Sequence, residues 1–277
     1  MSSPVDAATF RRLCRHEAQV HAVPGRELRD LGDGLLLYDP FDPEPFWNRL
    51  AAIAWPSEPS AFDRRLAEIG ILFASIGRQP HLWTSPDHDA PTDLVERLTA
   101  NGFVDTGPGF LLIADDATAS RAALAEPPGE RISIERHTNL AGLRSRAVAD
   151  TLVGVLLEAF DVGRERRDGV ISETMASLTD PRFTHYLIRV DGTPTAAARR
   201  ATFDGLTYIS SIGVVPAARG LGLGRRITAE ATVDGFEAGS ALAHLGVFEE
   251  NRVAKHLYER LGYRPSGRAG PDMMLLP

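Results

Sequence analysis

The sequence predicts an α+β or α/β protein with two lobes, each a mixed β-sheet flanked by helices. The chain has 277 residues, which is long for one compact domain and sufficient for two. Apolar residues make up 43% of it, as expected for an ordinary globular core. Segments with strand periodicity alternate with segments of helical periodicity along the whole chain, and this alternation predicts the fold class.

The N-terminal lobe is expected to span residues 1–115. Its first helix runs from about Asp6 to Val20, where Phe10, Leu13 and Cys14 recur with helical spacing. The elements that follow are expected, in chain order, as a strand at 34–38, a proline-rich loop at 39–45, helices at 46–54 and 61–76, a strand at 81–84, a helix at 92–100 and a strand at 110–113.

A linker, with room for one helical turn or more, is expected at residues 116–129, where the composition shifts to Ala, Asp and Ser and ends in a Pro-Pro-Gly break. The C-terminal lobe then spans residues 130–277. Asp-Gly pairs at 191–192 and 204–205 predict tight hairpins between three of its strands. Its expected elements are strands at 132–135, 184–190, 195–203, 206–215, 241–248 and 273–276, and helices at 140–160, 172–178, from the glycine-rich turn to 236, and at 252–261.

Composition argues against several classes of function. The net charge is −7 and the isoelectric point about 5.6, so the chain has no general basic footprint for nucleic acid or an anionic membrane. Cys14 is the only cysteine, which excludes an intrachain disulfide and a cysteine-based zinc cluster, and we expect no metal. No apolar run approaches the roughly 20 residues of a membrane span. We therefore expect a soluble, cytoplasmic protein.

A glycine-rich turn between a strand and a helix is the most informative feature. The run Ile212–Arg226 joins β-branched residues to three glycines, Gly220, Gly222 and Gly224. Unpaired N–H groups at a helix start, together with the positive end of the helix dipole, attract an anion, and glycines let it approach closely. The junction therefore predicts a phosphate site.

Two familiar phosphate loops do not fit this turn. A Walker loop needs Lys and Ser or Thr after its last glycine, where this chain has Arg225 and Arg226. A dinucleotide fingerprint needs a third glycine three residues after its second, and neither possible register provides one.

The pattern Arg-x-x-Gly-x-Gly, here Arg219-Gly-Leu-Gly-Leu-Gly224, resembles the acyl-CoA pyrophosphate loop of the GNAT acetyltransferase superfamily. A second block, Leu245–Tyr263, is similar to the next conserved region of that family, with a strand, an Asn, a helix carrying Ala and Tyr, and then Leu-Gly-aromatic. The resemblance covers roughly residues 130–277. It implies the GNAT acyl-CoA N-acyltransferase fold for the C-terminal lobe.

The resemblance also implies where acetyl-CoA or another acyl-CoA would bind as co-substrate. It would lie where the strands 206–215 and 241–248 splay apart, with its pantetheine arm paired to backbone groups like an extra strand. Arg219 as a surface turn residue, with glycines that only make a tight connection, is the alternative. The residues expected to bind acyl-CoA are Ile212, Gly213, Val214, Arg219, Gly220, Leu221, Gly222, Leu223, Gly224, Arg225 and Asn251.

Asn251 and Tyr258 carry the expected chemistry of the second block. Asn251 would contact the pantetheine arm, cap the following helix, or do both. Tyr258 lies two helical turns further on the same face, and by resemblance it is the catalytic acid that protonates the CoA thiolate. A core tyrosine is the alternative. The sequence singles out no general base among its weak candidates, which are Glu173, Ser210, Ser211, His244, Glu249 and Glu250.

The expected function is an N-acetyltransferase that moves an acyl group by direct attack to an amine of a small molecule or a peptide. The alternatives are a noncatalytic acyl-CoA sensor and a scaffold that binds no CoA. Acceptor recognition would involve residues 140–178, where the charged run Arg164–Asp168 is more typical of a solvated loop. The chain is expected to act as a monomer or homodimer.

The N-terminal lobe resembles a reduced copy of the same fold. Arg64-Arg65 begins a helix followed by a strand, a helix and Gly102-Phe103, in the order and nearly the spacing seen after Arg225-Arg226. The segment before it, Pro59–Asp63, contains no glycine, and no Asn or Tyr marks the second block. We expect no catalysis in this lobe.

Overall fold

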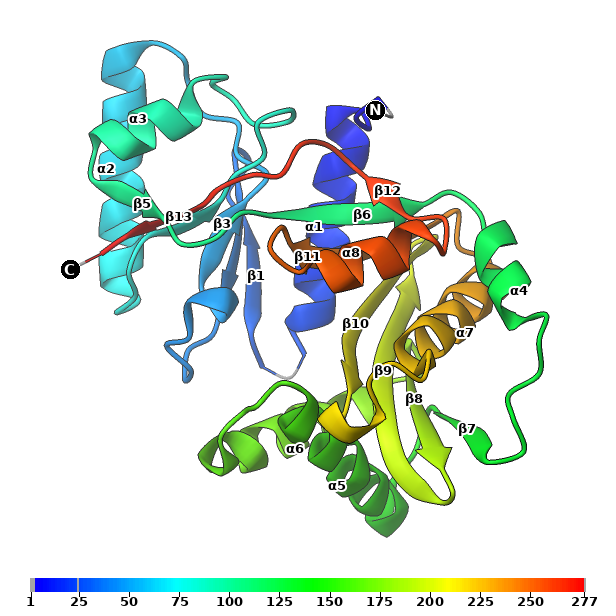
Figure 1. Ribbon diagram of the computed structural model, residues 1–277. Coiled ribbons are helices and arrows are strands. Elements are labelled where there is room, and N and C mark those ends of the chain that lie inside the picture. Colours follow the sequence, from blue (N-terminus) through cyan, green and yellow to red (C-terminus); the bar gives the residue numbers. More distant parts are fainter. Residues whose placement is uncertain (1–2, 24, 277) are drawn as a thin grey trace. The chain divides into compact units, whose positions relative to one another are not determined.

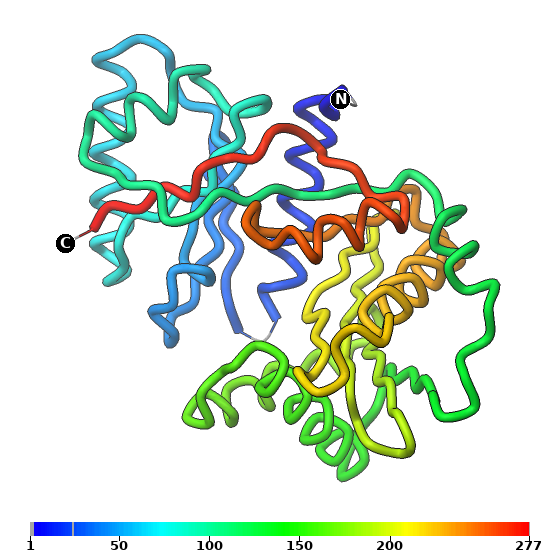
Figure 2. Tube along the Cα trace, in the orientation of Figure 1, coloured from blue at the N-terminus to red at the C-terminus, as the bar shows by residue number. Residues whose placement is uncertain are grey.

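The computed structural model describes residues 3–23 and 25–276 and divides the chain into two compact units. Figure 1 labels the elements, and Figure 2 follows the chain through them. The first unit comprises Met1–Leu112, Gly246–Arg252 and Pro265–Pro277, and the second comprises Ile113–Leu245 and Val253–Arg264.

The first unit contains three α-helices and a mixed sheet of six strands in the order β1-β2-β3-β4-β13-β5. The Asp6 carboxylate accepts the Thr9 N–H at the start of the first helix, and Glu58 caps the second in the same way. The elements are α1 (Ala7–His21), β1 (Glu27–Asp30), β2 (Leu35–Tyr38), η1 (Pro45–Trp47), β3 (Arg49–Ala51), α2 (Pro59–Ser75), β4 (His81–Trp83), α3 (Leu94–Ala100), β5 (Phe103–Asp105) and β13 (Asp272–Leu275).

Helices cover both faces of this sheet. Leu36 packs in a core cluster with residues of α2 and α3, whereas its neighbour Leu35 packs in a second cluster with Phe10 and Cys14 of α1. Successive residues of a strand point to opposite faces, so α1 lies on one face and α2 and α3 on the other.

A second, seven-stranded sheet has the order β12-β6-β11-β10-β9-β8-β7, and its strands β7 to β10 lie wholly within the second unit. Both Asp-Gly hairpins are confirmed, because Asp191, Gly192, Asp204 and Gly205 all have positive φ angles, as a type I′ turn requires. The elements are β6 (Gly109–Ala114), α4 (Thr118–Leu124), β7 (Ile132–His137), α5 (Gly142–Ala159), η2 (Arg164–Arg166), α6 (Arg167–Thr179), β8 (Phe183–Val190), β9 (Thr193–Phe203), β10 (Leu206–Val214), η3 (Pro216–Ala218), α7 (Leu223–Glu237), β11 (Leu242–Phe248), α8 (Arg252–Glu259) and β12 (Arg264–Pro265).

Two adjacent residues of β10 show how helices cover this sheet. A Cβ atom added at Gly213 would lie 2.9 Å from the Ala159 Cβ of α5, whereas the Val214 side chain lies beside Gly224 of α7. The two helices therefore pack on opposite faces, and the end of β10 lies between them (Figure 1).

Each sheet takes one strand from a distant part of the chain. β13 lies between β4 and β5, and β6, which precedes the expected linker, lies between β12 and β11. In Figure 2 the red end of the trace runs beside the segment of β5. Met273 in β13 is only 1% exposed. The sheets thus differ from the expected division into residues 1–115 and 130–277, because the final strand pairs within the first unit.

One expected element also has a different secondary structure from the one predicted. Residues 46–54 do not form a helix: they contain the end of η1 and the strand β3, whose Leu50 is fully buried between neighbouring strands. A short apolar run does not by itself separate a buried strand from a helix. The segment 116–129 contains the helix α4, consistent with the expectation that it includes a helical turn or more.

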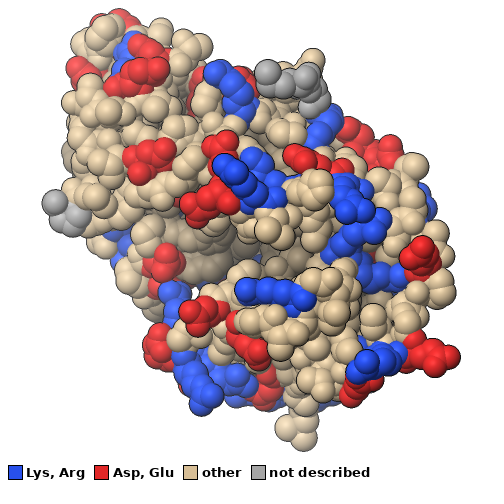
Figure 3. Space-filling model, viewed as in Figure 1, with Lys and Arg blue, Asp and Glu red and all other residues tan. Residues whose placement is uncertain are grey.

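Basic and acidic side chains are intermixed over the face shown in Figure 3. Among the residues that the structure describes, no helix combines the length and apolar character needed to cross a membrane.

Candidate active site

The strand β10 is irregular at the predicted cleft. It pairs with β9 up to Ser210 and again from Gly213, and Ser211 between them has a φ of 53°. Its parallel pairing with β11 runs from Leu206 to Tyr208 and then ends. Beyond Tyr208, this edge of β10 is open to an extended ligand, as the predicted splaying of the strands requires.

The glycine-rich turn presents a row of backbone donors. Gly220 and Gly222 have φ angles of 84° and 74°, and a Cβ on either would meet no atom within 4 Å. In the described chain the Arg219 N–H donates to Pro216 and the Arg226 N–H to Gly222, while the N–H groups of Gly220–Arg225 donate no hydrogen bond. Free N–H groups of this kind at the first turn of a helix are the donors that anion-binding helix starts use.

The three arginines of this segment have different surroundings. The Arg219 guanidinium donates to the Ala159 carbonyl oxygen at 2.9 Å, and the Arg226 guanidinium donates to the Glu126 carbonyl oxygen and to Glu230. Arg225 has a buried Nε without a hydrogen-bond partner among the described residues. Arg225 is therefore the side chain of this turn best placed to meet an added anion, and the Arg219 side chain anchors the turn to α5.

Two predicted ligand-binding glycines also have packing roles. Gly213 allows the close approach of α5, because a Cβ there would lie 2.9 to 3.5 Å from Ala159, Phe160 and Leu156. Gly224 faces Leu257 of α8 and Val214 of β10. The turn, the end of β10 and α8 thus meet within the second unit.

Tyr258 of α8 is 7% exposed, and its ring lies 6.1 Å from that of Tyr263 in an edge arrangement. Burial raises the pKa of Tyr258 to about 12. Tyr263 donates or accepts a hydrogen bond with the Thr232 hydroxyl at 2.7 Å, whereas no hydrogen bond of the Tyr258 hydroxyl is found within the described chain. The Tyr258 hydroxyl is thus a protonated group whose donor is available to a ligand.

The other predicted site residues fall into two groups. Ile212 and Val214 lie on the open stretch of β10, and Leu221 and Leu223 belong to the turn, where Leu221 is 60% exposed and Leu223 is buried. Asn251 directly precedes α8, and its N–H donates to the Phe248 carbonyl oxygen. Its capping or ligand-binding role stays a prediction.

Several of the general-base candidates are buried or engaged in other interactions. Glu173 of α6 accepts a hydrogen bond from Arg199 of β9 at 3.0 Å, and the Arg199 Nε donates to Ser210 at 3.2 Å. His244 is fully buried and its ring lies 4.9 Å from that of Tyr208. Glu249 and Glu250 are exposed.

Arg199 is a residue that sequence reasoning missed. It is 4% exposed, and it links α6 to the irregular part of β10. Its only sequence signal is a pair of arginines, Arg199 and Arg200, in the middle of an alanine-rich strand. No group of His, Cys, Asp and Glu able to hold a metal occurs among the described residues.

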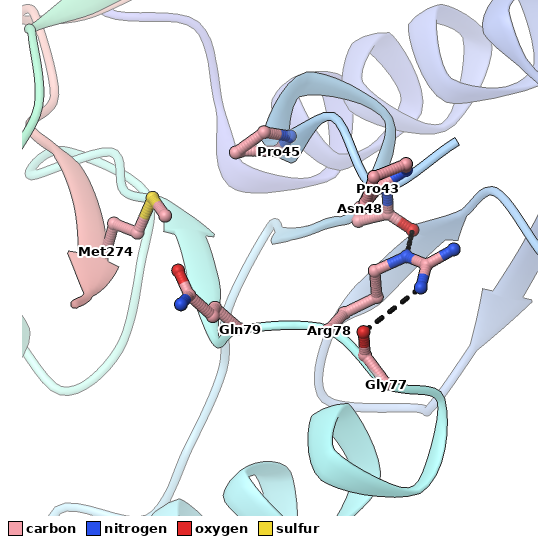
Figure 4. Close-up of a pocket in the computed structure, with 7 residues that line it drawn as sticks. All are labelled: Pro43, Pro45, Asn48, Gly77, Arg78, Gln79 and Met274. Atoms are coloured by element: carbon pink, nitrogen blue, oxygen red, sulfur yellow. Dashed lines mark hydrogen bonds between the residues drawn. The ribbon is translucent and has the colours of Figure 1, made fainter. Parts of the chain in front are cut away.

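A separate cavity of about 210 Å³ lies in the first unit (Figure 4). The Arg78 Nε donates to the Asn48 side chain at 3.2 Å, and its other nitrogens donate to backbone carbonyls, including that of Gly77. None of the predicted site residues lines this cavity. Its lining residues are Pro43, Pro45, Asn48, Gly77, Arg78, Gln79 and Met274.

Solved structures resemble the whole chain. A GCN5-related N-acetyltransferase from Kribbella flavida aligns with a TM-score of 0.68 and 23% identity, over 100% of this chain and 97% of that one. A tandem GNAT protein from the clavulanic acid biosynthesis pathway aligns with a TM-score of 0.61 and 14% identity, over 99% and 98%. A GCN5-related N-acetyltransferase from Sphaerobacter thermophilus gives 0.59 and 17%, over 94% and 86%. These likenesses show the fold.

No curated protein matches the chain in sequence. Residues 144–263 match the profile of the Acetyltransferase (GNAT) family, a range that includes the bulged strand, the glycine-rich turn and Tyr258. The chain therefore has the GNAT fold, and its residues 144–263 are similar in sequence to the Acetyltransferase (GNAT) family.

Proposed function

We propose that the protein is an acyl-CoA-dependent N-acyltransferase that transfers an acetyl group from acetyl-CoA to an amine. The observation that carries this proposal is the start of α7. There the N–H groups of Gly220–Arg225 donate to no group in the described chain, and the buried Arg225 Nε has no partner in it. Free N–H groups at an exposed helix start bind water or an anion, and a row of them beside a buried guanidinium nitrogen suits a pyrophosphate.

The remaining contacts expected of acyl-CoA follow from β10. The pantetheine arm is an extended chain with amide groups, and the open edge at Ile212–Val214 offers backbone groups for it to pair with. Gly220 and Gly222 leave the phosphate path free of side chains. These residues fit the group, and Asn251 remains a proposed contact.

Acyl transfer by direct attack forms a C–N bond from the amine to the thioester carbon and breaks the C–S bond. The sulfur leaves as a thiolate, which needs a hydrogen-bond donor or a proton. Tyr258 supports this step because a hydroxyl with a pKa of about 12 stays protonated at neutral pH. The amine loses its proton to solvent or to a general base, and we assign no residue to that role.

We also propose that the first unit is a degenerate copy of the GNAT fold. Its sheet places β3 and β4 in parallel and inserts β13 between β4 and β5, as the second sheet places β10 and β11 in parallel and inserts β6 between β11 and β12. The segment Pro59–Asp63 lacks the glycines of the second unit, so catalysis is assigned to the second unit alone.

A thiol-release assay with acetyl-CoA over amines, polyamines, aminoglycosides and peptides tests the function. We expect release with at least one acceptor, and Tyr258→Phe to lower turnover roughly 100-fold with CoA affinity changed less than about twofold. Tyr263→Phe is the matched control, because it removes the same hydroxyl group from the neighbouring tyrosine ring. Equal turnover in native protein and Tyr258→Phe contradicts the acid role, and CoA binding without any acyl transfer favours a sensor.

A further inference from the structure

The first unit contains a counterpart of the β10 bulge. β3 and β4 are parallel and pair at Leu50 and Leu82. Ala52, directly after β3, has a φ of 53°, the same value as Ser211 in β10. A positive φ in a non-glycine residue is uncommon, so its presence next to the parallel pair in both units marks an equivalent break in the strand.

In the first unit the chain itself occupies the open edge beyond this break. The Ala90 N–H donates to the Ile53 carbonyl oxygen at 2.9 Å, and the Trp55 N–H donates to the Ala90 carbonyl oxygen at 2.9 Å. Ala54 and Ala90 thereby form a parallel bridge. This is strand addition by an internal segment, in the place where β10 of the second unit no longer pairs with β11.

Asp89 fastens this segment to the continuations of both strands. One carboxylate oxygen accepts the Ile53 N–H after β3 at 3.0 Å, and the other accepts the Ser85 N–H after β4 at 2.6 Å. Asp89 is 8% exposed. A buried carboxylate that accepts one backbone donor from each strand continuation holds the two together across the gap.

The lengths of two connections explain the difference between the units. In the first unit, residues 84–93 connect β4 to α3, whereas only residues 249–251 connect β11 to α8. The longer connection can turn back at Ser85 and place Ala90 beside Ile53, as the bond from the Asp89 N–H to the Ser85 carbonyl oxygen shows.

We propose that residues 85–91, the plug segment, fill the strand edge of the first unit that corresponds to the open edge of β10. Together with the missing glycine-rich turn, the plug segment leaves one chain with one site for acyl-CoA rather than two. Asp89 acts as the positioning residue that keeps the plug segment in place. The comparison with a pantetheine arm rests on the proposed function, whereas the hydrogen bonds of the plug segment are independent of it.

Amide hydrogen exchange in the absence of CoA tests the plug segment directly. We expect the amides of Ala90 and Trp55 to exchange as slowly as that of Leu50 in β3. At a pH above about 8, where Asp89 is ionised, Asp89→Asn should speed exchange at Ile53 and Ser85 at least about tenfold, because a carboxamide offers one acceptor oxygen to two donors. Exchange of the native Ala90 amide as fast as that of an exposed loop overturns the proposal.

Asp87→Asn is the matched control. Asp87 lies in the same turn, but its carboxylate accepts from the backbone and side chain of Arg268 instead of from the strand continuations. We expect this variant to leave exchange at Ala90 and Trp55 unchanged. Equal acceleration by Asp87→Asn and Asp89→Asn contradicts the role of Asp89.

Calorimetric titration with CoA tests the binding ratio. We expect one CoA per chain in the native protein and in Asp89→Asn, because the first unit has no glycine-rich turn to hold a pyrophosphate. Two CoA molecules per native chain overturn the proposal. No binding, together with slow exchange at Ala90, rejects the proposed function of the second unit and leaves the plug segment supported.

Discussion

Asp89 makes the stability of the first unit depend on pH in an unusual direction. Burial raises the pKa of Asp89 to about 7, although the N–H bonds from Ser85 and Ile53 act to lower it. In the unfolded chain the pKa of an aspartate is about 3.9. The folded unit therefore holds the Asp89 proton more tightly than the unfolded chain does.

The sign and size of the effect follow from this difference. A group whose folded pKa is raised contributes stability that is present below its unfolded pKa and is lost as pH rises through the folded pKa. A difference of about 3 units, at about 1.4 kcal/mol per unit, makes the loss about 4 kcal/mol between pH ~4 and pH ~7. Asp89→Asn removes this slope, because the carboxamide does not titrate.

Tryptophan fluorescence is the suitable assay. The three tryptophans of the chain are Trp47, Trp55 and Trp83, which all belong to the first unit, so urea titrations followed by their emission report that unit. The pKa of Glu17 is lowered from its ordinary value of 4.5 to about 2, so its contribution to stability is lost only as the pH falls below about 4.5. Measurements between pH 4.5 and 7.5 therefore avoid the contribution of Glu17.

The difference between native protein and Asp89→Asn is the decisive quantity, because it cancels the titration of groups that both proteins share. We expect the free energy of unfolding of the native protein to fall by several kcal/mol, relative to the variant, across this pH range. Parallel curves for the two proteins would refute the reasoning, since they would show that the buried carboxyl is no harder to ionise than an unfolded one.

Three further predictions concern other parts of the chain. Glu17→Gln leaves Arg49, 2% exposed, without its carboxylate partner and should cost about 3–5 kcal/mol in the same urea assay, against less than about 1 kcal/mol for Glu27→Gln in an exposed pair. Gly222→Ala, at a φ of 74°, should weaken CoA binding about tenfold or more by calorimetry, whereas Gly192→Ala, with similar strain at φ 78° in a hairpin, should lower the thermal midpoint without changing affinity. A fragment of residues 1–115 lacks β13, so we expect its tryptophan fluorescence to show no cooperative unfolding transition in urea. Joining residues 265–277 to this fragment through a flexible linker should restore the transition. A cooperative transition of 1–115 alone would contradict the role of β13.

Local sequence signals predicted the elements of the second unit well where one interaction decides the conformation. The Asp-Gly pairs at 191–192 and 204–205 form hairpins because few other residues adopt two successive positive φ angles. The glycine-rich turn follows the same logic. Gly220 and Gly222 have the positive φ angles that such a turn needs, and the helix begins at Leu223.

Sequence signals failed where the partner of a segment decides its structure. Residues 49–51 become a strand because β2 and β4 lie on either side of them, and nothing within the apolar run itself announces these neighbours. The pairing of β13 with β4 and β5 is equally invisible, since β propensity does not specify which edge a strand joins.

The roles of the arginines show the same limit within the site. Arg219, Arg225 and Arg226 are chemically equivalent in the sequence, and the resemblance places both Arg219 and Arg225 among the residues expected to bind acyl-CoA. In the structure the carbonyl oxygens of Ala159 and Glu126 engage Arg219 and Arg226, and Arg225 keeps an unpartnered Nε. The sequence could not separate them, because these carbonyl acceptors come from segments 60 and 100 residues away.

A comparison of the two units indicates that the connecting loops, rather than the sheet, decide whether a unit can bind acyl-CoA. Both units have a parallel strand pair beside a residue with a φ of 53°, so both contain an interrupted strand edge. On our proposals, the second unit turns that edge into a ligand site because glycines precede α7 and the connection after β11 is short. The first unit fills the same edge because its connection after β4 is long enough to return. One strand geometry thus supports either a ligand or a stretch of its own chain, and the connecting loops determine which.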